Sequence, residues 1–200
     1  GPAVGIEYSP TGVALGREAG RRLIRGTVLQ LPFASASVDI VTSFDVLYCF
    51  DDAEEAQAIA EMARVLKPGG WALINVAALK ILSGGHSALG LEKRRYTRAR
   101  LRSAMEAGGF VIDRLSYTNL PTFPITLALR WFDRISGRAA KGSLANLKVP
   151  PTPINAIFDL ALRGEHAWLK RADLPIGSSL MCLAQSRGVR TTPSLRLPKR

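Results

Sequence analysis

The sequence predicts an α/β fold built on a doubly wound, mainly parallel sheet, and three observations support this prediction. Short apolar runs alternate with amphipathic helical patterns along the first half of the chain. The apolar runs are almost continuous, which is typical of parallel strands that are covered on both faces. Two late apolar runs flank a stretch with helical periodicity, so we expect a helical insertion before the last strand.

The first strand and helix are defined by a capped turn. The apolar run 3–6 predicts a short buried strand. Ser9 supplies a side chain suited to a helix N-cap, and Pro10 suits the first helical position. We expect this helix to end near Gly20 and a second strand to cover residues 23–28.

The rest of the chain continues the alternation. A helix should begin at Asp51 or Asp52, because Asp52 and Glu55 have the spacing of a capping box. We expect Pro68-Gly69-Gly70 to end that helix. The remaining predicted elements are strand 38–42, strand 71–76, a helix capped by Thr97 and closed by Gly108, strand 110–117, helices 125–136 and 154–163, and strand 180–185. The last two strands in this series are expected to pair in antiparallel fashion.

Composition narrows the function classes. The 200 residues suit one domain with a sizeable core. Cys49 and Cys182 lie far apart in apolar segments, which favours reduced thiols and a cytoplasmic protein. With His86 and His166 as the only histidines and no clustered cysteines, we expect no metal site. No apolar run reaches the about 18 residues that a membrane-spanning helix needs.

The net charge of +11 is concentrated in two segments. Six basic residues lie within 93–102, and five lie in the acid-free segment 187–200. Such clusters attract nucleic acid, anionic lipid or an acidic partner. Because no aromatic residues accompany the second cluster, we favour a solvated helix face and a flexible basic tail over a nucleic-acid site. Contact with a membrane surface stays open.

Three segments carry a family resemblance. They are Arg25-Gly-Thr-Val-Leu-Gln-Leu-Pro-Phe33, Val38-Asp-Ile-Val-Thr-Ser-Phe-Asp-Val-Leu47 and Ala63-Arg-Val-Leu-Lys-Pro-Gly-Gly-Trp-Ala-Leu-Ile-Asn75. In this order and spacing they resemble the class I S-adenosylmethionine-dependent methyltransferases of the type 11, ubiquinone- or menaquinone-biosynthesis-like group. The resemblance implies a Rossmann-like sheet with strand order 3-2-1-4-5-7-6, S-adenosyl-L-methionine as cofactor, and methyl transfer to a small or lipid-like acceptor.

The resemblance assigns cofactor contacts to the ends of three strands. Glu7 takes the place of the acid that faces the ribose hydroxyls, and Tyr8 would lie against the adenosine. Thr27 stands where the family carries an acid that pairs with the adenine amino group, and Val28 would meet the adenine ring through its backbone. After the third strand, the residues expected at the cofactor edge are Ser43, Phe44 and Asp45.

The sequence assigns no catalytic residue. Methyl transfer is an in-line displacement that depends on alignment, so it needs no pair of nucleophile and base. Cys49 stands where relatives carry a histidine, and we interpret it as structural, because an ordinary thiol is mostly protonated at neutral pH. The residues implied at the acceptor are Tyr48, Phe50, Arg95 and Tyr96. A charged helix start, with Tyr96 as a packing residue, is the alternative for the last two.

The glycine-rich turn that follows the family's first strand does not occur in the sequence. We therefore expect a fragment or a truncated relative, in which the first two strands are separated from the others because the central strand is missing. The expected organisation is a partial methyltransferase domain at 1–186, with a helical insertion or lid at 118–177, and a basic flexible tail at 187–200.

Two other functions stay open at this point. Without the glycine-rich turn, a truncated, non-catalytic methyltransferase-like protein that binds a partner is the main alternative. A nicotinamide dehydrogenase on a similar sheet would explain Glu7, but it would not explain Leu31-Pro32-Phe33 or Lys67-Pro68-Gly69-Gly70.

Overall fold

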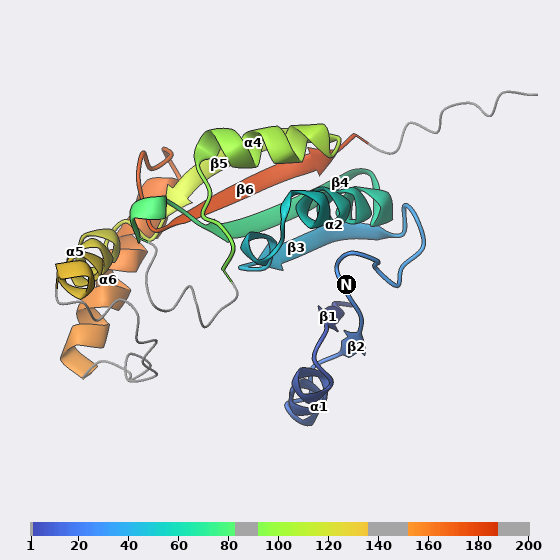
Figure 1. The fold of residues 1–200 in the computed structure, drawn as a ribbon, viewed down its shortest axis with the longest axis horizontal. Helices are drawn as coiled ribbons and strands as arrows, with labels where there is room; N and C mark the ends of the chain where they lie inside the picture. The colour runs from blue at the N-terminus through green and yellow to red at the C-terminus, as the bar shows by residue number, and fades with distance from the viewer. Residues whose placement is uncertain (1, 83–91, 136–151, 188–200) are drawn as a thin grey trace, which may run out of the picture.

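The computed structural model describes residues 2–82, 92–135 and 152–187, and it divides the strands into two sheets (Figure 1). The smaller sheet pairs β1 (Gly5–Glu7) with β2 (Leu23–Arg25) in parallel. The larger sheet has the order β3-β4-β6-β5. Its strands are β3 (Val38–Phe44), β4 (Leu66–Ala77), β5 (Phe110–Thr118) and β6 (Ser179–Ser186). The α/β class is therefore as predicted.

Helices pack on one face of the larger sheet and beyond its end. The helical elements are α1 (Pro10–Glu18), the 3-10 turn η1 (Leu47–Cys49), α2 (Asp52–Val65), the 3-10 turn η2 (Lys80–Leu82), α4 (Arg98–Ala107), α5 (Phe123–Ile135) and α6 (Thr152–Leu169). In Figure 1, α2 and α4 lie on one face of this sheet, and α5 and α6 lie beyond the carboxyl ends of β3 and β4. The last helix is longer than predicted, because it continues through Gly164.

The two sheets confirm the expected separation of the strands. Taken together as β2-β1 and β3-β4-β6-β5, they follow the family's order 3-2-1-4-5-7-6 with the central strand left out. β3 and β4 are parallel, whereas β6 is antiparallel to both β4 and β5. The predicted antiparallel pair is therefore confirmed, with Phe110 opposite Ser186 and Thr118 opposite Ser179.

The core lies between the larger sheet and the helices α2 and α4. Alternate residues of β4 point into it, and Ile59 and Met62 of α2 meet them from the other side. We expected β3, as an almost continuous apolar run, to be covered on both faces. This expectation is wrong for the face that points away from α2. Ile40 is 62% exposed and Phe44 is 51% exposed, because no helix within the described ranges packs on that face of the strand.

Two element ends differ from the prediction for local reasons. β2 ends at Arg25 rather than at residue 28, because the Thr27 hydroxyl accepts a hydrogen bond from the Leu29 N–H and turns the chain. α2 ends at Val65, ahead of the Pro68-Gly69-Gly70 turn that we expected to end it. The residues after Val65 already pair with β3, so the turn lies inside β4.

The cap of α2 is Asp51, and its capping box differs from the predicted one. The Glu54 N–H donates to Asp51 Oδ1 at 2.9 Å, and the Asp51 N–H donates to Glu54 Oε2 at 3.0 Å. Asp52 and Glu55, which have the same spacing, instead pair with arginines from a later segment. Asp51 with Glu54 and Asp52 with Glu55 both have the spacing of a capping box. The ion pairs of Asp52 and Glu55 with distant arginines leave Asp51 as the cap.

Candidate functional site

Glu7 is held at the end of β1 by the first turn of α1. Its Oε1 atom accepts a hydrogen bond from the Ser9 backbone N–H at 2.8 Å. Gly12 packs against the carboxylate, because a Cβ atom there would be 2.9 Å from the Glu7 carboxyl carbon. The other carboxylate oxygen makes no hydrogen bond to the part of the chain that the structure describes. The turn therefore leaves one oxygen for a ligand, next to the positive end of a helix.

Thr27 and Val28 follow β2 and lie beside the end of β1. The Gly26 N–H donates to the Glu7 carbonyl oxygen at 3.0 Å, which holds the two strand ends together. The Thr27 hydroxyl already accepts a backbone hydrogen bond at 3.2 Å, and Val28 is half-buried against the core of the larger sheet. Tyr8 is 78% exposed. Three of the four residues predicted here are thus brought together, and Tyr8 points into solvent.

The Leu31-Pro32-Phe33 motif ties the segment after β2 to α2. The Leu31 N–H donates to Glu61 Oε2 at 2.8 Å. Arg64 donates to the carbonyl oxygens of Leu31 and Phe33 at 3.0 and 2.9 Å. Arg64 also pairs with Glu61 at 2.6 Å, and its hydrogen bond holds the pKa of the Glu61 carboxyl below the usual value. The motif therefore fixes the position of the residues that follow β2.

Glu61→Ala is expected to loosen this segment. We expect the Leu31 amide hydrogen to exchange about tenfold faster or more, because it loses a charged acceptor worth about 1.5–3 kcal/mol. Hydrogen–deuterium exchange measures this rate. Glu106→Ala removes a carboxylate that pairs with Arg102 at 3.4 Å on α4, and as the matched control it should leave the Leu31 rate unchanged. An unchanged rate in Glu61→Ala would mean that apolar packing alone holds the motif.

The end of β3 carries an unpaired buried hydroxyl and a strained turn. Ser43 is buried, and its hydroxyl has no hydrogen-bond partner within the described ranges, which is a costly arrangement. Asp45 has a φ of 58°, in the left-handed region. Its N–H donates to the Asn75 carbonyl oxygen at 3.0 Å, and its Oδ1 accepts from the Asn75 side chain at 3.3 Å. Burial raises the pKa of Asp45, and this last hydrogen bond opposes the shift. Strain of this kind clusters at ligand sites.

Asn75 is a functional candidate that sequence reasoning missed. It lies opposite Phe44 in the β3–β4 ladder and makes both contacts with Asp45. A polar residue inside an otherwise apolar strand run was the available signal.

Tyr48 lies in η1, after β3, and Arg95 is held next to the end of β4. Their role at an acceptor stays a prediction. Burial, followed by the negative charge of Asp45, raises the pKa of the Tyr48 hydroxyl. Arg95 pairs with Glu92 at 2.6 Å and donates to the Ala78 carbonyl oxygen at 3.2 Å. Its guanidinium group therefore already has partners within the protein. Glu92 is, after Asn75, a second polar residue near the site that sequence reasoning missed.

Tyr96 and Phe50 pack in or against the core. Tyr96 is fully buried, and its hydroxyl hydrogen-bonds to the Glu55 carboxylate and to the Leu47 carbonyl oxygen. Burial and the Glu55 carboxylate raise the pKa of Tyr96, so the hydroxyl stays a donor. Phe50 is half-buried against the same core. This geometry favours the alternative in which Tyr96 is a packing residue.

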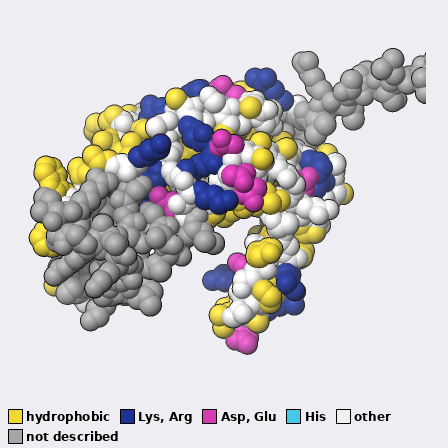
Figure 2. Space-filling model, in the orientation of Figure 1, with side chains coloured by type: hydrophobic (Ala, Val, Ile, Leu, Met, Phe, Trp, Pro, Cys, Tyr) yellow, Lys and Arg dark blue, Asp and Glu magenta, His cyan; other side chains and the backbone are white. Residues whose placement is uncertain are grey.

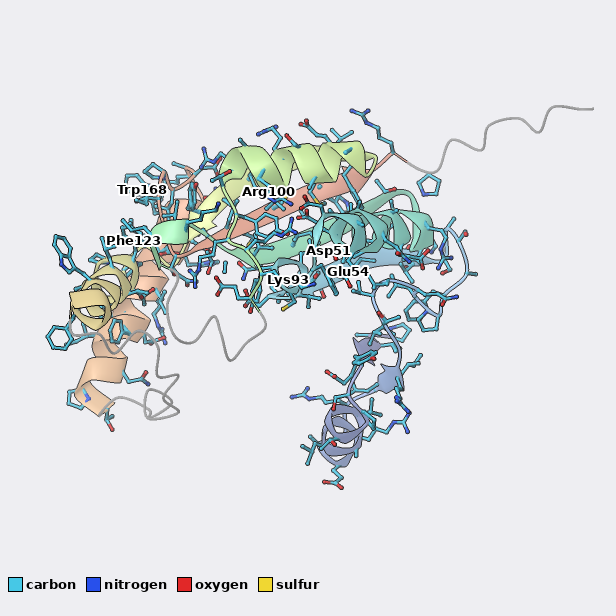
Figure 3. All side chains as sticks on the ribbon, in the orientation of Figure 1. Asp51, Glu54, Lys93, Arg100, Phe123 and Trp168 are labelled. Carbon is cyan, nitrogen blue, oxygen red and sulfur yellow. The ribbon has the colours of Figure 1, made fainter. Side chains whose placement is uncertain are left out.

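Basic residues of the segment that starts at Lys93 form a network of ion pairs with acidic residues of α2. Buried Glu55 pairs with Arg100 at 2.5 Å, and Lys93 pairs with Glu54 at 3.1 Å. Figure 3 shows Lys93 and Arg100 next to the N-terminal turn of α2, and Figure 2 shows basic and acidic side chains interleaved on this face. The network fastens this segment to α2 and neutralises charge that would otherwise attract nucleic acid.

Cys49, Cys182 and His166 are the cysteines and histidine that lie within the described ranges, and no metal centre is recognised there. Burial raises the pKa of Cys49 and raises that of Cys182 to about 11, so both thiols are protonated at neutral pH. Among the residues that the structure describes, no three histidine, cysteine or acidic side chains are grouped so as to hold a metal ion. His86 lies outside the described residues, as does all but the first residue of the predicted tail at 187–200.

The insertion is fastened at the carboxyl end of β5, next to a cavity. The Glu165 carboxylate on α6 accepts hydrogen bonds from the N–H groups of Asn119 and Leu120, both at 2.7 Å. Beside this anchor lies a cavity of about 380 Å³, lined mainly by apolar residues that include Leu120, Trp168 and Leu174. The insertion thus combines a polar anchor with an apolar hollow.

Comparisons with known proteins agree with this arrangement. Residues 1–74 match a family model described as a methyltransferase domain of type 11. The protein ECU09_1500 of Encephalitozoon cuniculi, described as a methyltransferase, is 37% identical over 119 residues, which cover 58% of this chain and 49% of that protein. A probable S-adenosylmethionine-dependent methyltransferase of Mycolicibacterium smegmatis is 32% identical over 114 residues, covering 55% of this chain and 44% of that protein. The chain therefore spans about half the length of these curated relatives.

Solved structures show the same fold at low identity. A methyltransferase in complex with the Trm112 activator of Haloferax volcanii superposes with a TM-score of 0.57 at 19% identity, over 92% of this chain and 71% of that one. The fold is that of a Rossmann-like α/β protein, with polar residues at the carboxyl ends of β1 and β3. Together with the sequence matches, it shows that the chain is similar to class I S-adenosylmethionine-dependent methyltransferases, as the resemblance implies.

Proposed function

We propose that the protein binds S-adenosylmethionine at the carboxyl ends of β1 and β3 and transfers its methyl group to an apolar, lipid-like acceptor. The observation that carries the proposal is the pair of polar strand ends. One holds a carboxylate, and the other holds an unpaired buried hydroxyl next to a strained aspartate. Both ends border the position of the family's central strand in the sheet order. Ligands of open α/β sheets bind outside such strand ends.

The residues present fit the cofactor in their chemistry. Glu7 offers a charged acceptor for ribose hydroxyls, and the backbone of Val28 offers a contact for the adenine ring. The buried Ser43 hydroxyl would gain a partner from a polar ligand at this edge. When bound, the cofactor supplies a methyl group on an electrophilic sulfonium. The task of the chain is then to hold the acceptor in line and to exclude water.

The insertion supports an apolar acceptor. α5 and α6 lie beyond the carboxyl ends of β3 and β4 (Figure 1), and the cavity of about 380 Å³ next to α6 has a mainly apolar lining. Cavities of this size hold small ligands.

Calorimetric titration with S-adenosylmethionine tests the proposal. We expect the chain of 200 residues to bind the cofactor weakly or not at all. A version that carries a strand and a glycine-rich turn of the family type ahead of Gly1 is expected to bind it, because glycine alone lets the backbone approach the cofactor closely. The matched control carries the same added segment with its glycines replaced by valine, and should not bind.

Two outcomes would contradict parts of this proposal. Tight binding by the 200-residue chain alone would mean that the site does not depend on the glycine-rich turn. Absence of binding in the version with the added turn would favour the alternative, a non-catalytic methyltransferase-like protein that binds a partner. Titration with a nicotinamide dinucleotide in the same experiment tests the dehydrogenase alternative, which predicts that this ligand binds and S-adenosylmethionine does not.

A further inference from the structure

We propose that α5 and α6 dock the protein on the surface of an anionic lipid bilayer. The surface concerned, the α5–α6 apolar surface, consists of exposed apolar residues at the end of the molecule where β3 and β4 terminate (Figure 1). Its members are Ile125, Trp131 and Phe132 on α5 and Ile157, Leu160 and Trp168 on α6. Docking itself does not depend on methyl transfer. Delivery of a lipid acceptor from the bilayer to the apolar cavity would rest on the proposed function.

α5 turns one apolar face outward. Ile125, Ala128 and Phe132 have the i, i+3, i+7 spacing of one helix face, and all three are exposed. Trp131, beside them, is 65% exposed. Thr126 is half-buried, with its hydroxyl bonded to a backbone carbonyl. Phe123 and Leu127 are half-buried as well, so α5 carries apolar residues on its inner and its outer side. The exposed outer ones indicate an apolar contact outside the chain.

α6 repeats the pattern. Ile157, Leu160 and Trp168 fall on one helix face, and they are 67%, 71% and 59% exposed. Phe158 and Leu169 fall on a different face and are half-buried, the latter against the core. Figure 3 shows Trp168 at the end of α6 that joins the sheet, where it also lines the cavity. The apolar surface therefore continues into the hollow.

Polar contacts hold this face outward. Glu165 is bonded to two amides that follow β5, as described above, and Arg114 on β5 pairs with Asp173, just after α6, at 2.7 Å. Together they fix the rotation of α6 about its own axis. Leu160 cannot turn toward the core without breaking these contacts, so its exposure is built into the fold.

The composition of the surface favours a bilayer over another protein. Two of the three tryptophans of the chain, Trp131 and Trp168, lie here, and tryptophan is enriched where proteins meet lipid headgroups. Lys170 and Arg171, at the end of α6, are exposed and form no ion pair with the residues that the structure describes. Basic residues next to an apolar face attract anionic lipid.

The contact that we propose lies in the plane of the headgroups. Among the described residues, no helix has the length and apolar character needed to cross a bilayer. α5 and α6 instead have the exposed apolar and aromatic faces of helices that lie in the interface. Figure 2 shows hydrophobic side chains gathered at this end of the molecule.

Vesicle sedimentation of the 200-residue chain tests the proposal. We expect binding to vesicles of phosphatidylcholine with phosphatidylglycerol, much less binding to phosphatidylcholine alone, and weaker binding at high salt. Leu160→Ser is expected to lower the partition coefficient about five- to tenfold, and Trp131→Ser at least as much, because each removes apolar area that docking would bury. Leu15→Ser is the matched control: it changes a leucine on α1 that is 62% exposed, against 71% for Leu160, and should leave binding unchanged.

Circular dichroism and thermal unfolding should be unchanged in all three variants, because the altered side chains are exposed. Equal losses in Leu160→Ser and Leu15→Ser, or no binding to the anionic vesicles, would overturn the proposal. If Leu160→Ser instead abolishes a self-association seen in ultracentrifugation, and vesicles do not compete with it, the surface binds a second copy and the bilayer proposal is wrong. Neither measurement uses S-adenosylmethionine, so failure here leaves the methyl-transfer proposal standing.

Discussion

Glu7→Gln is expected to lower the affinity for S-adenosylmethionine about tenfold or more in a version of the protein that binds the cofactor. Hydrogen bonds to a charged acceptor are worth about 1.5–3 kcal/mol each, and about 1.4 kcal/mol is a factor of ten. Glutamine keeps the shape and the bond to the Ser9 N–H, but it replaces the remaining oxygen with an amide donor and removes the charge. Calorimetric titration measures the change.

The ranking of variants is the sharper test. Thr27→Ala should cost less, because its hydroxyl is neutral and already accepts a backbone hydrogen bond. Gly12→Ala should resemble Glu7→Gln, because the added methyl group would displace the carboxylate. Cys49→Ser should change little, since burial raises the thiol pKa and keeps it neutral. If Cys49→Ser abolishes turnover while Glu7→Gln leaves cofactor affinity intact, the chemistry lies after β3 and our assignment is wrong.

Gly177→Ala is expected to lower the free energy of unfolding by about 3 kcal/mol. An added Cβ atom would lie 2.1 Å from the Thr118 carbonyl oxygen and 3.0 Å from the Thr118 nitrogen. The Thr118 backbone cannot retreat easily, because it is paired with Ser179 in the β5–β6 ladder. Overpacking against fixed backbone forces shifts that a flexible side chain would avoid. Urea denaturation followed by tryptophan fluorescence measures the loss.

Gly164→Ala on α6 is the matched control. A Cβ atom there meets nothing within 4 Å, and the residue lies inside a helix. We expect a gain of about 0.5–1 kcal/mol, because glycine is the poorer helix former. Equal unfolding free energies for the two alanine variants would mean that the segment before β6 adapts, and that the close approach at Gly177 does not hold β5 and β6 together.

Local patterns were sufficient for the order and type of the elements. Ser9 and Thr97 cap their helices as expected, because a cap depends only on one side chain and the amides of the next turn. The separation of the strands into two groups followed from the family's strand order and the absent glycine-rich segment, and the sheets agree with it. The contact between Glu7 and the following turn is local too, because Glu7 binds the N–H of Ser9, two residues away. The role of Glu7 at a cofactor stays a prediction that rests on the resemblance.

Contacts between distant segments were decided by the tertiary structure alone. The choice of Asp51 over Asp52 as cap depended on arginines more than forty positions away, which the local spacing could not weigh. Tyr96 became a core residue because Glu55 on α2 accepts its hydroxyl. The periodicity of α5 and α6 predicts an apolar face on each helix. It does not tell whether that face points to the core or to the solvent. Only the packing of the helices against β5 and η2 decided that these faces point outward.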